Sequence, residues 1–371
     1  MNYIDNTENI EKSKTGEQTH EEVRKIQFTG KSTYVVSLPK KWVSFWGLKA
    51  GSQVTIYQKG DSLVLTPRGS GRPQERSNIA LIKVSSDDEA DAIGRKIIAL
   101  YLLGYKYIYI KTDEKSIDTL QRTRIKDLIR KKLVGTEIIS ETEEEIKIQV
   151  LVRYPDLSIE NALKRMCLIA SFMHEKSIQA LKNQDKKLAS EIINLDDEVD
   201  RFGLYVVRQL KAAVVDEQVL QEIGLSSRQD CLGYRVIVKF VERIADHATT
   251  IAKSIIETDI KITDKEYTHI LEMSNLARKS FEDAIKALFT KDCTLAEEVI
   301  SNERNTVIME GQAIKELQSR RKISEIANMR MILESIRRCA EYACDIAEVV
   351  INLNIENELA EKKNFQRTIN S

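Results

Sequence analysis

The sequence predicts a multidomain, mainly α-helical protein with an N-terminal β domain, a small α+β middle domain and C-terminal tandem three-helix bundles. Short strand-like runs dominate residues 25–66, and strand-like and helix-like segments alternate over residues 79–152. From residue 156 onward, apolar side chains recur at alternating spacings of four and three, which is the period of an amphipathic helix. At 371 residues the chain can hold several domains, each with its own core.

The first predicted domain covers residues 21–68 and follows a polar segment, residues 1–20, that is predicted to be a disordered tail. Two strands at residues 25–29 and 34–38 precede a short helix, which Pro39 begins and Gly47 ends, and a hairpin at residues 52–66. So short a domain buries little apolar surface by itself, so we expect it to dimerise.

Basic residues gather in this domain although the formal net charge of the whole chain is zero. Residues 21–72 contain nine basic and three acidic residues, an excess of six. Such an excess favours a polyanionic partner. The basic residues are Arg24, Lys25, Lys31, Lys40, Lys41, Lys49, Lys59, Arg68 and Arg72.

A resemblance to the AbrB/SpoVT family is carried by the segment Arg24-Lys-Ile-Gln-Phe-Thr-Gly-Lys-Ser-Thr-Tyr-Val-Val-Ser-Leu-Pro-Lys-Lys-Trp42 and the following Gly47-Leu-Lys-Ala-Gly-Ser-Gln-Val54. The resemblance implies a swapped-hairpin β domain, in which two chains interleave their hairpins and basic side chains contact DNA. Those cations would neutralise phosphates and make binding depend on salt. The alternative is a solvated basic face on a module that only dimerises. The implied DNA-binding residues are Arg24, Lys25, Lys31, Lys40 and Lys41.

The middle domain is predicted over residues 76–154, after a flexible break at residues 67–73. Its elements alternate strand, helix, strand, helix, strand, strand, which we interpret as a ferredoxin-like α+β domain. The domain has no glycine-rich phosphate loop and no histidine. We therefore expect it to be a connector or an interaction domain without chemistry of its own.

The helical region is predicted to be a duplicated bundle, with halves at residues 156–258 and 262–355. A shift of 107 residues aligns residues 189–210 with 296–317, and a shift of 95 aligns residues 242–253 with 337–348. The difference of twelve predicts a longer connection after Leu210 in the first half.

Acidic pairs one helical turn apart occur on two helices of the first half. Asp196 and Asp200 flank one apolar stripe, while Glu242 and Asp246 lie opposite the stripe that contains Val241 and Ile244. If the two helices are neighbours, the four carboxylates can converge, and their mutual repulsion would favour a bound cation. The alternative is an ordinary solvated acidic face. His247 beside them is interpreted as a packing or solvated side chain rather than a ligand.

The motifs Asp196-Asp-Glu-Val-Asp200 and Glu242-Arg-Ile-Ala-Asp-His-Ala-Thr-Thr-Ile-Ala252, in duplicated bundles, resemble the phosphate-uptake regulator family PhoU, in its archaeal type with a DNA-binding domain. The resemblance implies metal binding on the bundle surface and repression of phosphate uptake, with the phosphate ABC transporter, its ATPase included, and a membrane sensor kinase as partners. The implied cofactor is a divalent or transition metal ion, with Mg, Mn, Ca, Fe and Zn all open. By position, the implied ligands are Asp196, Asp200, Glu242 and Asp246.

The second half departs from this pattern. Asp200 aligns with Val307 and Glu242 with Arg337, while Glu303 and Glu341 retain carboxylates. An arginine would oppose a cation there, so we expect at most one well-formed metal site, in the first half.

Taken together, these features predict a homodimeric, cytoplasmic, DNA-binding regulator of phosphate uptake that is not an enzyme. No apolar run reaches the roughly 18 to 20 residues that span a bilayer, and the five cysteines are interpreted as free core thiols. One alternative is an accessory protein that acts on the transporter ATPase without binding DNA. A metal-dependent hydrolase is disfavoured, because no nucleophile and base pair is evident and the four histidines are scattered.

Overall fold

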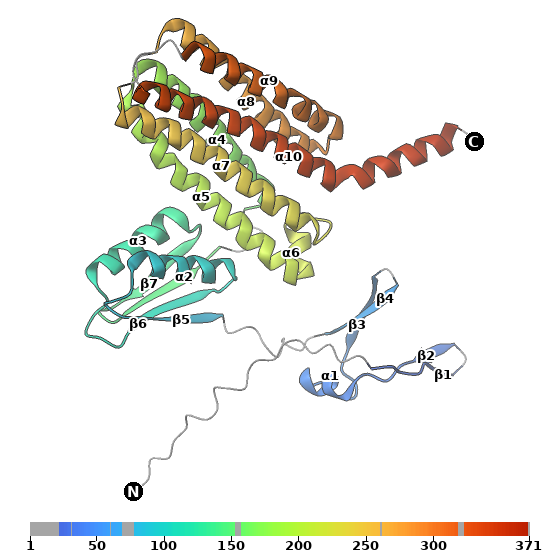
Figure 1. Ribbon diagram of the computed structural model, residues 1–371. Helices are drawn as coiled ribbons and strands as arrows, with labels where there is room; N and C mark the ends of the chain where they lie inside the picture. The colour runs from blue at the N-terminus through green and yellow to red at the C-terminus, as the bar shows by residue number, and fades with distance from the viewer. Residues whose placement is uncertain are drawn as a thin grey trace. The chain divides into compact units, whose positions relative to one another are not determined.

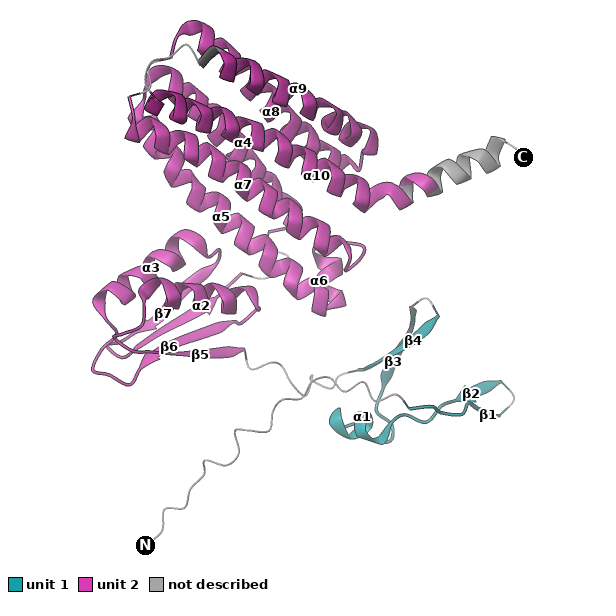
Figure 2. Cartoon of the chain, in the orientation of Figure 1, with its two compact units in different colours: residues 1–77 teal, residues 78–371 magenta. Residues whose placement is uncertain are grey.

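The computed structural model describes residues 22–30, 32–59, 61–68, 78–152, 157–259, 262–317 and 323–369 (Figure 1). The chain divides into two compact units, residues 1–77 and 78–371 (Figure 2). The tail predicted at residues 1–20, Lys31 and most of the predicted break at residues 67–73 lie outside the described residues.

The described residues of the first unit form two hairpins and one short helix. Strands β1 (Gln27–Thr29) and β2 (Thr33–Val35) pair antiparallel, with Phe28 opposite Tyr34. Helix α1 (Lys40–Phe45) follows, and strands β3 (Val54–Lys59) and β4 (Ser62–Pro67) form the second hairpin. This is the predicted order of elements. Where exposure is defined in the described part of residues 22–68, no side chain is buried.

The α+β domain begins the second unit. Its elements are β5 (Ile79–Val84), α2 (Ala90–Leu102), β6 (Tyr107–Thr112), α3 (Thr119–Lys132), β7 (Thr136–Glu141) and β8 (Glu145–Val150). The sheet order is β5-β6-β8-β7, with β5 and β6 parallel and the other pairs antiparallel. Both helices cover one face of the sheet (Figure 1), and alternate strand residues such as Ile108, Ile110 and Ile148 are buried beneath them.

The ferredoxin-like interpretation of this domain is wrong in its topology. A ferredoxin-like fold runs β-α-β-β-α-β, whereas this chain runs β-α-β-α-β-β. One crossover through α2 makes β5 and β6 direct parallel neighbours, and the final hairpin then adds to β6 through its second strand. The sequence reveals the elements, but which strand pairs with which is a long-range choice that local patterns do not encode.

In the described part of residues 157–369, the chain forms seven helices. They are α4 (Ile159–Asn183), α5 (Lys186–Val215), α6 (Glu217–Glu222), α7 (Asp230–Glu257), α8 (Asp264–Thr290), α9 (Cys293–Leu317) and α10 (Ile323–Ile369). Local signals set their starts: Ser158 and Asp185 accept backbone N–H groups at α4 and α5, and Thr263 forms a capping box with Glu266 at α8. The extra connection predicted in the first half contains α6.

The two halves, α4–α5–α7 and α8–α9–α10, share one hydrophobic core. Apolar residues of the predicted α7 stripe, including Ile237, Val241, Ile244 and Ala248, are fully buried. Helices α7 and α10 pack together, and the rings of Phe240 and Tyr342 stack across them with centroids 5.7 Å apart. All five cysteines are buried and none forms a disulfide, which confirms the prediction of core thiols. Among the described residues, no helix combines the length and the apolar character needed to cross a membrane.

Candidate functional site

The acidic residues singled out in the sequence lie on neighbouring helices. Asp196 and Asp200 belong to α5, Glu242 and Asp246 belong to α7, and these two helices pack against each other. Partial burial, together with the negative charges of Asp200 and Asp246, raises the pKa of Asp196 to about 6. Partial burial and the neighbouring Glu242 also raise the pKa of Asp246. The negative charges of Asp200 and Asp246 therefore act between the two helices.

A lysine from the α+β domain reaches this acidic face. The Nζ atom of Lys132, the last residue of α3, lies 2.8 Å from Oδ2 of Asp200 and 3.4 Å from Oδ1 of Asp197. Burial by itself would lower the pKa of Lys132, but the hydrogen bond to Asp200 and the two aspartate charges raise it overall. On α7, Lys239 pairs with Glu242 at 2.5 Å. Two of the four candidate ligands are thus neutralised by lysines.

The side chains, as they lie, do not fit a metal ion. Within the part of the chain that the structure describes, no three His, Cys, Asp or Glu side chains are grouped so that they could hold one. Lys132 binds Oδ2 of Asp200 and Lys239 binds Oε1 of Glu242, so one oxygen of each carboxylate already faces a cation. A metal site at Asp196, Asp200, Glu242 and Asp246 stays a prediction.

His247 packs between the two halves of the helical region. Its half-buried ring lies 5.8 Å from the ring of Tyr342, measured between centroids. Burial and the nearby positive charge of Arg338 lower the pKa of His247. This geometry agrees with a packing histidine.

On the corresponding face of the second half, an arginine side chain provides a positive charge. Arg337 on α10 pairs with Glu341, one turn along the same helix, and its Nε atom lies 2.9 Å from Oε2 of Glu310 on α9. Arg338 pairs with Glu341 as well. Arg337, which interrupts the acidic pattern, therefore forms ion pairs with Glu310 and Glu341.

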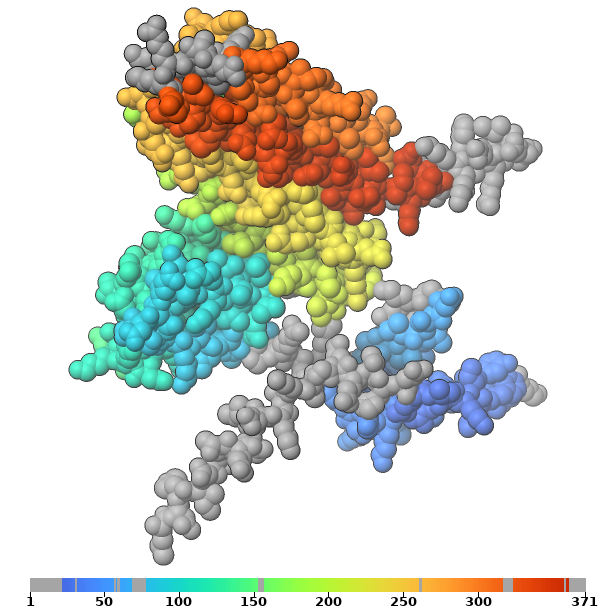
Figure 3. Space-filling view, in the orientation of Figure 1, coloured from blue at the N-terminus to red at the C-terminus, as the bar shows by residue number. Residues whose placement is uncertain are grey.

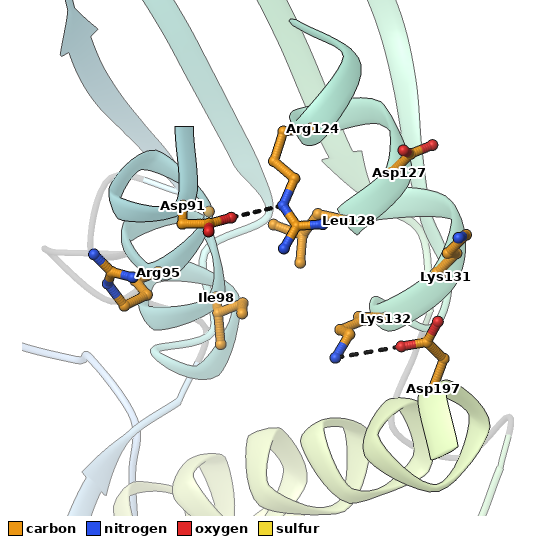
Figure 4. A pocket seen from close by; sticks show the side chains of 10 residues that line it. Asp91, Arg95, Ile98, Arg124, Asp127, Leu128, Lys131, Lys132 and Asp197 are labelled. Atoms are coloured by element: carbon orange, nitrogen blue, oxygen red, sulfur yellow. Dashed lines mark hydrogen bonds and ion pairs between the residues drawn. The ribbon is translucent and has the colours of Figure 1, made fainter. Parts of the chain in front are cut away.

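The α+β domain meets the helical region along a charged seam. Figure 3 shows this domain lying directly against the helical region, and α2 and α3 both contact α5. A pocket of about 360 Å³ opens along the seam (Figure 4). Within the α+β domain, Arg124 Nε on α3 lies 2.7 Å from Asp91 Oδ1 on α2, and Lys132 of α3 ion-pairs with Asp197 of α5 across the seam. The pocket walls contain Asp91, Gly94, Arg95, Ile98, Arg124, Asp127, Leu128, Lys131, Lys132 and Asp197.

A buried arginine anchors the same seam. Arg208 on α5 donates hydrogen bonds to the carbonyl oxygens of Tyr101, Gly104 and Tyr105 at the C-terminal end of α2, and its guanidinium lies 4.8 Å from the centroid of the Tyr101 ring. A cation at a helix C-terminus also interacts favourably with the negative end of the helix dipole. Sequence reasoning missed Arg208 and Lys132, because their partners lie far away along the chain.

The candidate DNA-binding residues sit on the first unit. Lys25 precedes β1, Lys40 and Lys41 begin α1, and all three are exposed. Arg24 is also exposed and pairs with Glu22. Lys31 lies outside the described residues. Their contact with DNA stays a prediction.

Comparisons with known proteins find matches to the helical region and to the N-terminal domain. The PhoU domain model matches residues 163–255 and 270–350, and the MazE bacterial antitoxin model matches residues 27–73. The phosphate-specific transport system accessory protein PhoU homolog of Borreliella burgdorferi is 23% identical over 198 residues, covering 49% of this chain and 84% of that protein. The homolog of Clostridium acetobutylicum is 21% identical over 200 residues, covering 53% of this chain and 90% of that protein.

A solved structure is similar as well. The crystal structure of PhoU from Pseudomonas aeruginosa is 22% identical, with a TM-score of 0.47, and the match covers 53% of this chain and 94% of that one.

Proposed function

We propose that the protein is a DNA-binding regulator of phosphate uptake, because the PhoU domain model matches its helical region and the MazE bacterial antitoxin model matches its N-terminal domain. Its PhoU relatives are named as accessory proteins of the phosphate-specific transport system, which supports the link to phosphate. The proposal gives DNA binding to residues 21–68 and the response to phosphate supply to the helical region.

One observation carries the DNA-binding part of the proposal. The first unit exposes apolar side chains in quantity, with Tyr34 73% and Leu63 67% exposed, and none of its described side chains with a defined exposure is buried. Such a unit lacks the burial that stabilises a fold, so it needs a second copy of itself. An interleaved dimer would carry the exposed Lys25, Lys40 and Lys41 of both chains, and their positive charges would neutralise DNA phosphates.

The test is a binding assay of the full-length protein against the promoter of a phosphate-transport operon and a scrambled duplex, over a salt series. Lys40→Ala/Lys41→Ala protein should bind the promoter at least about tenfold more weakly, and the slope of log K against log salt should fall by up to about four for a dimer. A matched control is Lys279→Ala/Lys286→Ala, which removes two exposed lysines of α8. Equal binding by wild type and Lys40→Ala/Lys41→Ala would remove the DNA-binding role.

The second candidate function is an accessory protein that acts on the phosphate transporter without binding DNA. The names of the PhoU relatives favour it. Its test is co-purification with the transporter ATPase: a complex that survives Lys40→Ala/Lys41→Ala, together with no promoter binding by wild type, would establish this reading in place of the first.

A further inference from the structure

The pocket at the seam has the position and the size of a small-molecule site. Its walls come from α2 and α3 of the α+β domain and from α5 of the helical region (Figure 4). Its volume of about 360 Å³ lies near the lower end of the range for such sites, roughly 300–1,000 Å³, and such sites often lie between domains. We propose that this pocket binds a small phosphate monoester with one ring system, of the size of a mononucleotide.

One wall of the pocket is apolar and contains a glycine inside a helix. Gly94 and Ile98 of α2 lie one turn apart, and Leu128 of α3 lies beside them. A glycine inside a helix lowers its stability relative to alanine. The backbone of Gly94 is helical, and an added Cβ would meet Leu128 Cδ2 at 3.6 Å, which is an ordinary contact. Neither conformation nor packing therefore requires glycine here, and the lack of a side chain leaves room for the ring of a ligand.

The charge of the pocket on the side of the α+β domain favours an anion. Helix α3 contains six basic residues and one acidic residue. Arg122 and Lys126 both pair with Glu141 of β7, outside the pocket. Arg124 lines the pocket and reaches from α3 towards α2, where its Nε atom pairs with Asp91 (Figure 4). That ion pair uses Nε, so the two Nη groups can donate to a phosphate oxygen in the forked geometry that arginine offers.

A second arginine and the acidic side of the pocket set the orientation of the ligand. Arg95 of α2 pairs with Glu89 at 3.4 Å, where both side chains are exposed, and such a pair is weak enough to exchange for a phosphate. Two arginines match a phosphate monoester, which carries nearly two negative charges at neutral pH. On the α5 side, Asp197 pairs with Lys132 and would repel an anion. The phosphate therefore belongs beside Arg95 and Arg124, and a ligand hydroxyl can donate to Asp197.

An occupant of this pocket would contact the α+β domain and α5 at once. Its binding should therefore stabilise the contact between the domain and the helical region, which links the concentration of a metabolite to domain docking. This inference goes beyond the proposed function and does not depend on DNA binding.

Calorimetry with the full-length protein tests the site. The probes are AMP, UMP and phenyl phosphate, and at least one should bind with a dissociation constant below about 1 mM. Arg124→Gln should weaken that binding at least about tenfold, because it removes the charge-assisted hydrogen bonds. The matched control is Arg130→Gln, which removes an exposed arginine of the same helix outside the pocket and should bind like wild type. Adenosine, without the charge, and inorganic phosphate, without the ring, should each bind at least about tenfold more weakly than the tightest monoester.

Two further measurements locate the ligand. Gly94→Leu should fill the apolar wall and abolish binding, with a thermal melt to show that the variant is folded; if it is not, Arg124→Gln decides. The tightest monoester should slow hydrogen exchange in α2 and α3 of wild type and leave Arg124→Gln unchanged.

Three results would overturn the inference. They are no binding of any of the three monoesters, equal binding by Arg124→Gln and Arg130→Gln, and inorganic phosphate binding as tightly as the monoesters. Promoter binding is measured with DNA and tests the proposed function separately.

Discussion

His174 on α4 and Ser274 on α8 share a hydrogen bond of 2.9 Å between Nε2 and Oγ, and both side chains are buried. The bond joins the first half of the helical region to the second at a point that water does not reach. Burial, together with the positive charge of Arg278, lowers the pKa of His174 from 6.5 to about 4. The imidazole is therefore neutral in the folded protein at neutral pH.

This relationship predicts acid-sensitive stability. The unfolded chain protonates His174 near pH 6.5 and the folded chain only near pH 4, so unfolding takes up a proton between these values and stability falls as the pH is lowered through this window. At pH 5 the loss should be about 2 kcal/mol relative to pH 7.5. Urea unfolding of wild type and His174→Gln at both pH values measures it, because the variant retains every other titrating group. An equal pH dependence in the two proteins would contradict this account.

Replacing Arg208 should weaken the contact between the α+β domain and α5. Arg208→Ala leaves the carbonyl oxygens of Gly104 and Tyr105 without this donor and removes the contact with the Tyr101 ring, at a cost of about 2–4 kcal/mol. Arg208→Lys keeps the charge but loses the forked geometry, so its effect should be intermediate. Chemical unfolding measures both, with Lys211→Ala, an exposed change on the same helix, as the control within about 0.5 kcal/mol of wild type.

Gly135 should resist substitution for two reasons. Its φ of 62° is left-handed, and an added Cβ would lie 1.8 Å from Cγ2 of Val152. We expect Gly135→Ala to cost about 2–4 kcal/mol, whereas Gly224→Ala, with φ of 80° and open space around it, should cost only about 1 kcal/mol. Thermal unfolding compares them. Val152→Ala in the Gly135→Ala background should recover part of the loss, and no recovery would rule out the predicted clash.

The exposed rings of the first unit should decide the oligomeric state. Phe28 and Tyr34 face each other across the first hairpin with centroids 5.1 Å apart, and both rings are mostly exposed. Phe28→Glu/Tyr34→Glu should convert a dimer into a monomer in light scattering coupled to size exclusion, because charge replaces the apolar surface that a second copy would cover. The matched control is Leu120→Glu, at an equally exposed apolar residue of α3. A dimer that persists in the double variant would place the self-association elsewhere.

Local patterns in the sequence were sufficient for most of the fold. Ile237, Val241, Ile244 and Ala248 are buried as their spacing predicts, because a helix periodicity fixes which face is apolar wherever the helix packs. The duplicated halves followed from internal alignment. Strand order in the α+β domain did not, since β6 pairs with β8 across an intervening helix and strand.

The acidic residues were located correctly, but their environment could not be predicted. Spacing places Asp200 and Glu242 on their helices, and it predicts that the carboxylates converge only if the two helices are neighbours. It contains no information about Lys132, whose ion pair with Asp200 depends on how two domains dock. The sequence alone predicted a metal ion at this acidic face. In the structure, Lys132 and Lys239 supply the positive charges there.

Because the two helical halves share a single core, we expect that neither half folds by itself. A chain cut between residues 259 and 264 would expose the faces of α4 and α7 that α8 and α10 cover, including the buried Ile244, whose carbonyl oxygen faces Cys339 of α10. The pair should unfold in one cooperative transition. Arg337 stands where the first half has a carboxylate, while the helices of the second half still cover the first half within the shared core.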